Sequence, residues 1–273
     1  RAYIMKLTPV LIGLLTIILS LSCKKNSNTN TPPPTQTSSI DTGLLAHYTF
    51  VGNTQDISGN GYHLTSFGPT PSADRFGISA SAYKFNGKTD YMTIPALLKA
   101  ESVRQFSIAV WVKPTEITYN SILSLLSIIS NSCSSSISIS HEGSSFIIRN
   151  KVIFFDSPNN CTVGIGSGAT ADLTGNWHHL VLVQTYISGP NETNPRYNYD
   201  LYYDGRKFSL GSSGIGSNPK AISLVKGGII GGNNNSGNYA ANFEMFTGDI
   251  DDIRIYKRAL TSAEITEIYN LKK

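Results

Sequence analysis

Short segments of alternating apolar and other side chains, separated by Gly, Asn and Asp, constrain the fold of this chain more than any other feature. Phe106–Pro114 and Trp177–Tyr186 are clear examples, and their period of two is that of a β-strand. No helical segment of ten residues is expected before Thr261, which forms a capping box with Glu264. The pattern therefore predicts an all-β antiparallel sandwich in one domain, closed by a short C-terminal helix.

The last predicted strand, Thr247–Leu260, carries three carboxylates at its start, on Asp249, Asp251 and Asp252. These charges repel one another unless a cation or a basic partner offsets them. Regular alternation of this strand predicts two sets of side chains on opposite faces, the first being Ile250, Asp252, Arg254 and Tyr256 and the second Asp251, Ile253 and Ile255.

Three more local predictions concern the interior of the domain. Ala82–Ile94 is expected to form a hairpin that turns at Asn86 and Gly87, a favoured two-residue turn. Phe146–Arg149 and Val152–Asp156 are expected to be separate strands. The alternation of Phe106–Pro114 places two sets of side chains on opposite, covered faces: Phe106, Ile108, Val110 and Val112 on one, and Ala109 and Trp111 on the other.

The N-terminal segment indicates export. Arg1 and Lys6 precede an apolar run, Val10–Leu21, that is short for a transmembrane helix, which needs about 20 apolar residues. The run ends at Cys23, and this resembles a bacterial lipoprotein signal in which the Cys becomes the lipidated first residue. Ser20 departs from that signal, where Leu is usual, and an ordinary signal peptide with an incidental Cys is the alternative.

These features predict three regions: a signal peptide at 1–22, the lipidated Cys with a Ser/Thr/Asn/Pro-rich tether at 23–40, and the folded domain at 41–273. The expected location is the bacterial cell envelope, anchored by lipid at the outer membrane or cell surface. Two other cysteines remain, Cys133 and Cys161, and in an exported protein we expect them to form a disulfide, with two free buried thiols as the alternative.

The charge of the chain excludes one class of partner. It carries 22 Lys and Arg against 18 Asp and Glu, a formal net charge of +4, and two of the positive charges lie in the predicted signal. Such a weak positive charge does not favour binding to nucleic acid or to an anionic membrane surface. Contact with the membrane is therefore expected only through the N-terminal lipid.

Several stretches resemble laminin G-like (LamG, concanavalin A-like) jelly-roll domains. They are His47–Phe50 with the turn Asp56–Gly61, Asp74–Gly77 with Ala82–Ile94, Phe106–Pro114, Trp177–Thr185 and Gly248–Ile265. The resemblance implies that the last strand lies beside the first and closes the sandwich. Lectins, adhesion modules, glycan hydrolases and glycan lyases share this architecture, so the fold does not decide the function.

The sequence gives no sign of a catalytic site. Glycoside hydrolases need two carboxylates across the scissile bond, and none of the seven Glu residues fits the Glu-x-Asp-x-x-Glu pattern of laminarinase-like enzymes. The Tyr-x-Lys-x-Gly-x-Tyr pattern of the lyase group is also absent. His179 follows His178 and Trp177, as in LamG strands, and we expect a structural role for it. We predict no catalytic residue and no enzyme activity.

The acidic residues at the two ends of the domain suggest a metal. Calcium binds six to eight oxygen atoms, and relatives of the resembled family often hold a structural calcium near the termini. Asp56, Asn60 and Asp252 are the predicted ligands. In the alternative, Asp56 caps its own turn and Asp252 pairs with Arg254 or Lys257.

Exposed aromatic and Asn-rich segments suggest a ligand site. Sugar rings stack on aromatic faces while polar groups bind the hydroxyls, and the predicted contacts are Tyr186, Tyr197, Tyr199, Asn234 and Tyr239. Ordinary turns and sheet tyrosines are the alternative reading of the same residues. The sequence thus predicts a non-catalytic module that binds a glycan or a surface protein, with a divergent glycan-degrading enzyme or a structural envelope component as alternatives.

Overall fold

The computed structural model describes residues 39–97, 105–115, 122–129, 134–141, 148–155, 164–169, 175–187, 196–208, 227–231 and 245–272. The chain divides into two units, residues 1–36 and 37–273, and all of the described residues lie in the second. Cys23, Cys133, Cys161, Asn234 and Tyr239 lie outside the described residues, so the predictions made for them stay predictions. No helix in the described part of the chain has the length and apolar character needed to cross a membrane.

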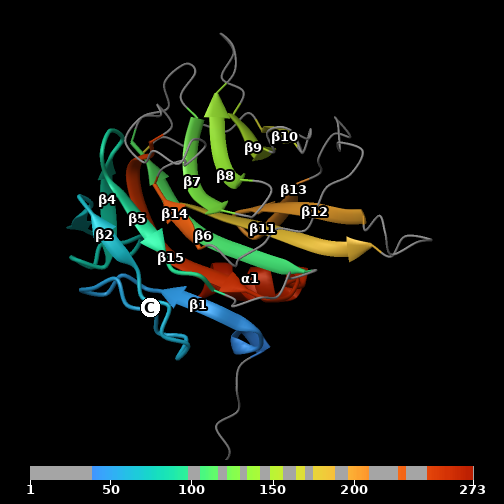
Figure 1. The fold of residues 1–273 in the computed structure, drawn as a ribbon, viewed down its shortest axis with the longest axis horizontal. Helices are drawn as coiled ribbons and strands as arrows, with labels where there is room; N and C mark the ends of the chain where they lie inside the picture. The colour runs from blue at the N-terminus through green and yellow to red at the C-terminus, as the bar shows by residue number, and fades with distance from the viewer. Residues whose placement is uncertain are drawn as a thin grey trace, which may run out of the picture. The chain divides into compact units, whose positions relative to one another are not determined.

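The described strands form two antiparallel sheets (Figure 1). The first has eight strands, in the order β13 (Arg206–Phe208), β12 (Arg196–Tyr203), β11 (His178–Ile187), β6 (Phe106–Pro114), β15 (Thr247–Tyr256), β4 (Ala82–Asn86) and β3 (Thr70–Ser72), with β1 (Leu44–Tyr48) also paired to β15. The second has seven, in the order β10 (Gly164–Ala169), β9 (Ile148–Phe155), β8 (Ser134–His141), β7 (Ile122–Ile129), β14 (Gly228–Ile230), β5 (Tyr91–Ile94) and β2 (Thr65–Phe67). This confirms the predicted all-β sandwich.

Strand β15 lies at the centre of the first sheet. It pairs with β6 along one edge, while its other edge is shared by β4, which pairs with Thr247–Ile250, and β1, which pairs with Ile253–Tyr256. The first strand and the last strand are therefore neighbours, as the family resemblance implies. His47 of β1 can in this way reach the carboxylate of Asp252 on β15.

The central strands of the first sheet, β6 and β15, are buried on both faces. Its inner face contributes to the main hydrophobic core, which includes Phe106, Ile108, Val110 and Val112. Its outer face is covered by α1 (Ser262–Asn270) and by η1 (Ser39–Asp41), and Ala109 packs there with Ile40, Ile265 and Ile268. The predicted division of the β6 side chains between two covered faces is therefore confirmed, and so is the capping box of Thr261 and Glu264.

Two of the local predictions are wrong. Ala82–Ile94 does not form a hairpin, because β4 belongs to the first sheet and β5 to the second, so the turn at Asn86 carries the chain from one sheet to the other. The Asn86 side-chain carbonyl accepts hydrogen bonds from the backbone of Lys88 and Thr89, an Asx turn that suits such a corner. The residues Asn150 and Lys151 do not separate two strands, since both lie inside β9 and pair with its neighbours.

The regular alternation predicted for β15 is also wrong, because the strand contains a β-bulge. Asp251 pairs with Trp111 of β6 and Arg254 pairs with Ala109. Two residues of β15, Asp252 and Ile253, therefore lie opposite one residue of β6, Val110. Asp252 has φ = +43°, a left-handed conformation that Asp tolerates better than most residues. The extra residue reverses the alternation, so Ile250, Ile253 and Ile255 all join the inner core.

Candidate functional site

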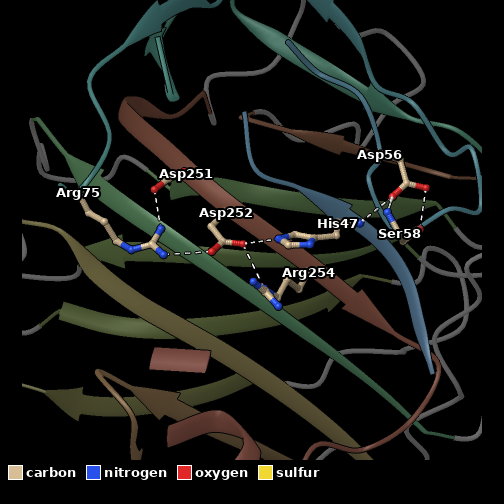
Figure 2. A network of polar contacts seen from close by, with 7 residues as sticks. All are labelled: His47, Asp56, Ser58, Arg75, Asp251, Asp252 and Arg254. Carbon is tan, nitrogen blue, oxygen red and sulfur yellow. Dashed lines mark hydrogen bonds and ion pairs between the residues drawn. The ribbon is translucent and has the colours of Figure 1, made fainter. Parts of the chain in front are cut away.

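The bulge in β15 directs two carboxylates toward one guanidinium group on the outer side of the first sheet. Arg75 donates from Nη1 to Asp251 at 2.6 Å and from Nη2 to Asp252 at 3.1 Å (Figure 2). All three side chains are buried, with exposed fractions of 4% for Arg75, 0% for Asp251 and 4% for Asp252. The guanidinium of Arg75 therefore offsets the repulsion between the two adjacent carboxylates. Arg75 is the basic partner that the crowding of acids in the sequence predicts.

Two further side chains complete this charged cluster, which we call the bulge network: His47, Arg75, Asp251, Asp252 and Arg254. One oxygen of Asp252 accepts from His47 Nε2 at 2.9 Å and from Arg254 Nε at 3.2 Å. Two carboxylates thus face two guanidinium groups, and their formal charges balance. Burial by itself raises the pKa of Asp252, but the His47 hydrogen bond and the positive charges of Arg254 and Arg75 outweigh it and hold the pKa far below its usual range.

The segment Asp74–Ile78, which we call the Arg75 loop, is closed on itself by Asp74. One carboxylate oxygen of Asp74 accepts from the backbone N–H groups of Phe76 and Ile78, both at 2.8 Å, and Gly77 takes φ = +79°. The backbone N–H of Asp74 also donates to the carbonyl of Ile78. The loop is therefore a compact turn whose conformation places Arg75 against β15 and β6 and leaves Phe76 exposed.

Arg75 lies within a stack of aromatic rings. Its guanidinium carbon is 4.6 Å from the ring centre of Phe76 and 4.7 Å from that of Trp111 on β6. On the same outer side, Trp111 stacks on Tyr269 of α1 with the ring centres 5.5 Å apart and the planes 12° apart. Cation–π contacts of this kind stabilise a desolvated guanidinium. The stack joins the Arg75 loop, the centre of the sheet and the C-terminal helix.

Asp56 organises the turn after β1. One of its oxygens accepts from the backbone N–H groups of His47 and Ser58, and the other from the Ser58 hydroxyl and the backbone N–H of Tyr62. Burial raises the pKa of Asp56, but these hydrogen bonds have the larger effect. The pKa of Asp56 is therefore below its ordinary value. Because His47 donates its backbone N–H to Asp56 and its ring Nε2–H to Asp252, it connects the turn after β1 to the bulge of β15 (Figure 2).

The predicted calcium ligands do not fit a shared ion in this arrangement. Asp56 uses both oxygens for protein donors, Asp252 faces two guanidinium groups and a histidine, and the Asn60 amide donates to the carbonyls of Leu44 and Leu45. Both halves of the alternative, a capping Asp56 and an Asp252–Arg254 pair, are present. In the part of the chain that the structure describes, no group of three His, Cys, Asp or Glu residues is placed to hold a metal. Calcium binding by this protein stays a prediction.

The two adjacent histidines of β11 lie in different environments. His179 is 1% exposed, lies on the outer side against Trp111 and Tyr269, and neither of its ring nitrogens has a hydrogen-bond partner within the described residues. Burial lowers the pKa of His179 to about 4. The ring of His178 instead stacks on Tyr203, and its Nδ1 lies 3.0 Å from an oxygen of Asp204. His179 is thus neutral near pH 7 and packs as an aromatic side chain.

Three of the predicted ligand contacts lie on neighbouring strands. β11 and β12 pair so that Tyr186 is opposite Tyr197 and Gln184 is opposite Tyr199. Tyr186 is half-buried and packs against the inner core. The pairing brings these three positions to one end of the β11–β12 ladder.

The sequence did not point to His47 and Arg75 as site residues. Each lies in a segment that resembles the family, but nothing in its local pattern shows that it faces an acid more than 170 positions away in the chain. The only available signal was the crowding of acids in β15, which required a positive partner without naming it.

The sequence matches the concanavalin A-like lectin/glucanases superfamily over residues 86–266, well over half of the chain. This protein belongs to that superfamily. A comparison with curated proteins finds no match.

Solved structures with the same fold include carbohydrate complexes. Domain 4 of AbnA, a GH43 extracellular arabinanase from Geobacillus stearothermophilus solved with arabinotriose, is 20% identical with a TM-score of 0.59, over 83% of this chain and 98% of that domain. The binding domain of botulinum neurotoxin DC, solved with SialylT, is 14% identical with a TM-score of 0.57, over 85% of this chain. The chain spans about half the length of that binding domain and of the binding domain of Paraclostridial Mosquitocidal Protein 1 (16% identity, TM-score 0.54).

Removing the charge of Arg75 tests the bulge network. We expect Arg75→Met to lower the free energy of unfolding by about 3 kcal/mol, because two buried carboxylates lose their shared partner. Lys207→Met is the matched control, since Lys207 pairs with Asp200 at 2.9 Å but is 53% exposed, and its loss should cost less than about 1 kcal/mol. Denaturant unfolding of both variants gives the two values, and equal losses would contradict a special role for Arg75.

The buried His179 predicts a specific pH dependence. The pKa of His179 is about 4 in the folded protein against 6.5 for an ordinary histidine. Between pH 6.5 and pH 4, the unfolded chain therefore binds a proton at this residue that the folded protein does not bind. Stability is then fully present above pH 6.5 and falls by about 3 kcal/mol as the pH drops to 4. His179→Phe should reduce this fall in unfolding experiments across the pH range, and an unchanged slope in the variant would refute the assignment.

Proposed function

We propose that this protein is a non-catalytic glycan-binding module of a lipid-anchored protein of the bacterial cell envelope. The observation that carries the proposal is the match to AbnA domain 4, a domain of similar extent that was solved with arabinotriose. The complex of the botulinum neurotoxin DC binding domain with SialylT supports the same ligand class. A surface protein remains the other ligand class that this type of module serves.

The chemistry of the described acids supports a binding role over hydrolysis. A hydrolase needs two carboxylates that reach the substrate, whereas Asp56, Asp251 and Asp252 are each buried and bound by protein donors. The low exposure of these three carboxylates fits a structural role. Tyr186, Tyr197 and Tyr199 stay the proposed sugar contacts, and the β11–β12 ladder supports that proposal because its pairing brings three aromatic residues to neighbouring positions.

A carbohydrate array tests the function. We expect the purified domain, residues 37–273, to bind a subset of printed neutral and sialylated oligosaccharides, arabinotriose and SialylT among them. Incubation with the same compounds should release no shorter product by chromatography, because the buried carboxylates Asp56, Asp251 and Asp252 are bound by protein donors. Release of a shorter product would instead show that the protein is a glycan-degrading enzyme. If the domain neither binds nor cleaves any of the compounds, the role of a structural envelope component is favoured.

The lipid anchor needs a separate test in cells. We expect Cys23→Ser to move the protein from the membrane fraction to the soluble fraction and to abolish labelling by a fatty-acid analogue, because the acceptor thiol is lost. Cys133→Ser is the matched control and should keep both membrane partition and label. If Cys23→Ser stays in the membrane fraction, the anchor proposal is wrong.

A further inference from the structure

We propose that the Arg75 loop is a second glycan contact, with the exposed ring of Phe76 as a stacking platform for a neutral sugar. This inference rests on the proposed function and adds a site to it. Arg75 lies with Trp111 and Tyr269 on the outer side of the first sheet, whereas Tyr186 packs against the inner core. The two contacts therefore belong to opposite faces of that sheet.

The Arg75 loop exposes two large apolar side chains. Phe76 is 46% exposed and Ile78 is 48% exposed, and neither belongs to the two described hydrophobic clusters. Apolar side chains left in water gain nothing from the hydrophobic effect. The loop nevertheless holds both of them in fixed positions, because Asp74 binds the backbone N–H groups of these same two residues.

The ring of Phe76 is supported on one face by Arg75. The guanidinium of Arg75 lies 4.6 Å from the ring centre on one side, and two buried carboxylates and Trp111 hold the guanidinium in place. A ring that is already supported on one face loses less conformational entropy when a ligand stacks on it than an unsupported ring does. Rigid aromatic side chains supply contact area at low entropic cost in binding sites generally.

The solvent-facing part of the Arg75 loop is uncharged, which favours an uncharged ligand. Asp74 is 3% exposed and the Arg75 side chain is 4% exposed, so the part of the loop that meets solvent, Phe76–Ile78, presents no charge. The adjacent Ser79 is exposed and offers a hydroxyl. One ring and one hydroxyl suit the apolar face and the hydroxyls of a sugar. A protein partner requires a surface of roughly 800 Å² on each side, much more than a single tight turn provides.

The experiment compares Phe76→Ala with Phe67→Ala. Phe67 is a matched control because it is similarly exposed, at 43%, but it lies on β2 of the second sheet and its ring stacks on Tyr91 with the ring centres 4.7 Å apart. Both variants and the wild-type domain are applied to the array of neutral and sialylated oligosaccharides. The dissociation constant of the strongest neutral compound is then measured by calorimetry.

We expect Phe76→Ala to weaken binding of that neutral compound about tenfold and Phe67→Ala to leave it unchanged. Phe76→Trp should retain binding, and melting curves should show that all three variants fold. If the wild type binds and Phe76→Ala binds equally well, or if only sialylated compounds bind, the loop proposal is overturned while the proposed function stands. If the wild type binds no oligosaccharide, the function and the loop proposal both fail.

Discussion

The pairing of Arg75 with two adjacent buried carboxylates is the interaction on which the rest of this structure depends. A buried acid without a partner costs several kcal/mol, and here the bulge of β15 buries two acids side by side. One planar guanidinium satisfies both at once, which an ammonium group cannot do with the same geometry. The position of Arg75 in turn requires the closed turn that Asp74 forms.

Several distant parts of the chain meet through this network. His47 brings the first strand and the Asp56 turn to Asp252, and Arg75 brings the loop before β4. Trp111 and Tyr269 extend the contact to β6 and to the C-terminal helix. The repulsion that the sequence shows in β15 is therefore offset by protein cations. The side chains of the bulge network thereby join the two ends of the domain.

The sequence predicted the architecture because its signals are local. Alternation in Phe106–Pro114 and the capping box at Thr261 each depend on neighbouring residues, and the structure confirms both. The bulge at Asp252 depends on pairing between β15 and β6, which no local pattern encodes, so one inserted residue reversed the predicted faces. Long-range pairing also decides the turn at Asn86, which has the sequence of a hairpin although β4 and β5 belong to different sheets. It likewise decides that Arg75 is the partner of the acids in β15.

A double-mutant cycle between Arg75 and Asp252 tests the central claim most directly. The free energy of unfolding is measured for the wild type, Arg75→Met, Asp252→Asn and the double variant. If the two residues form one buried unit, the double variant is more stable than the sum of the single losses implies, by a coupling energy of about 2 kcal/mol. Additive losses, with a coupling near zero, would contradict the account.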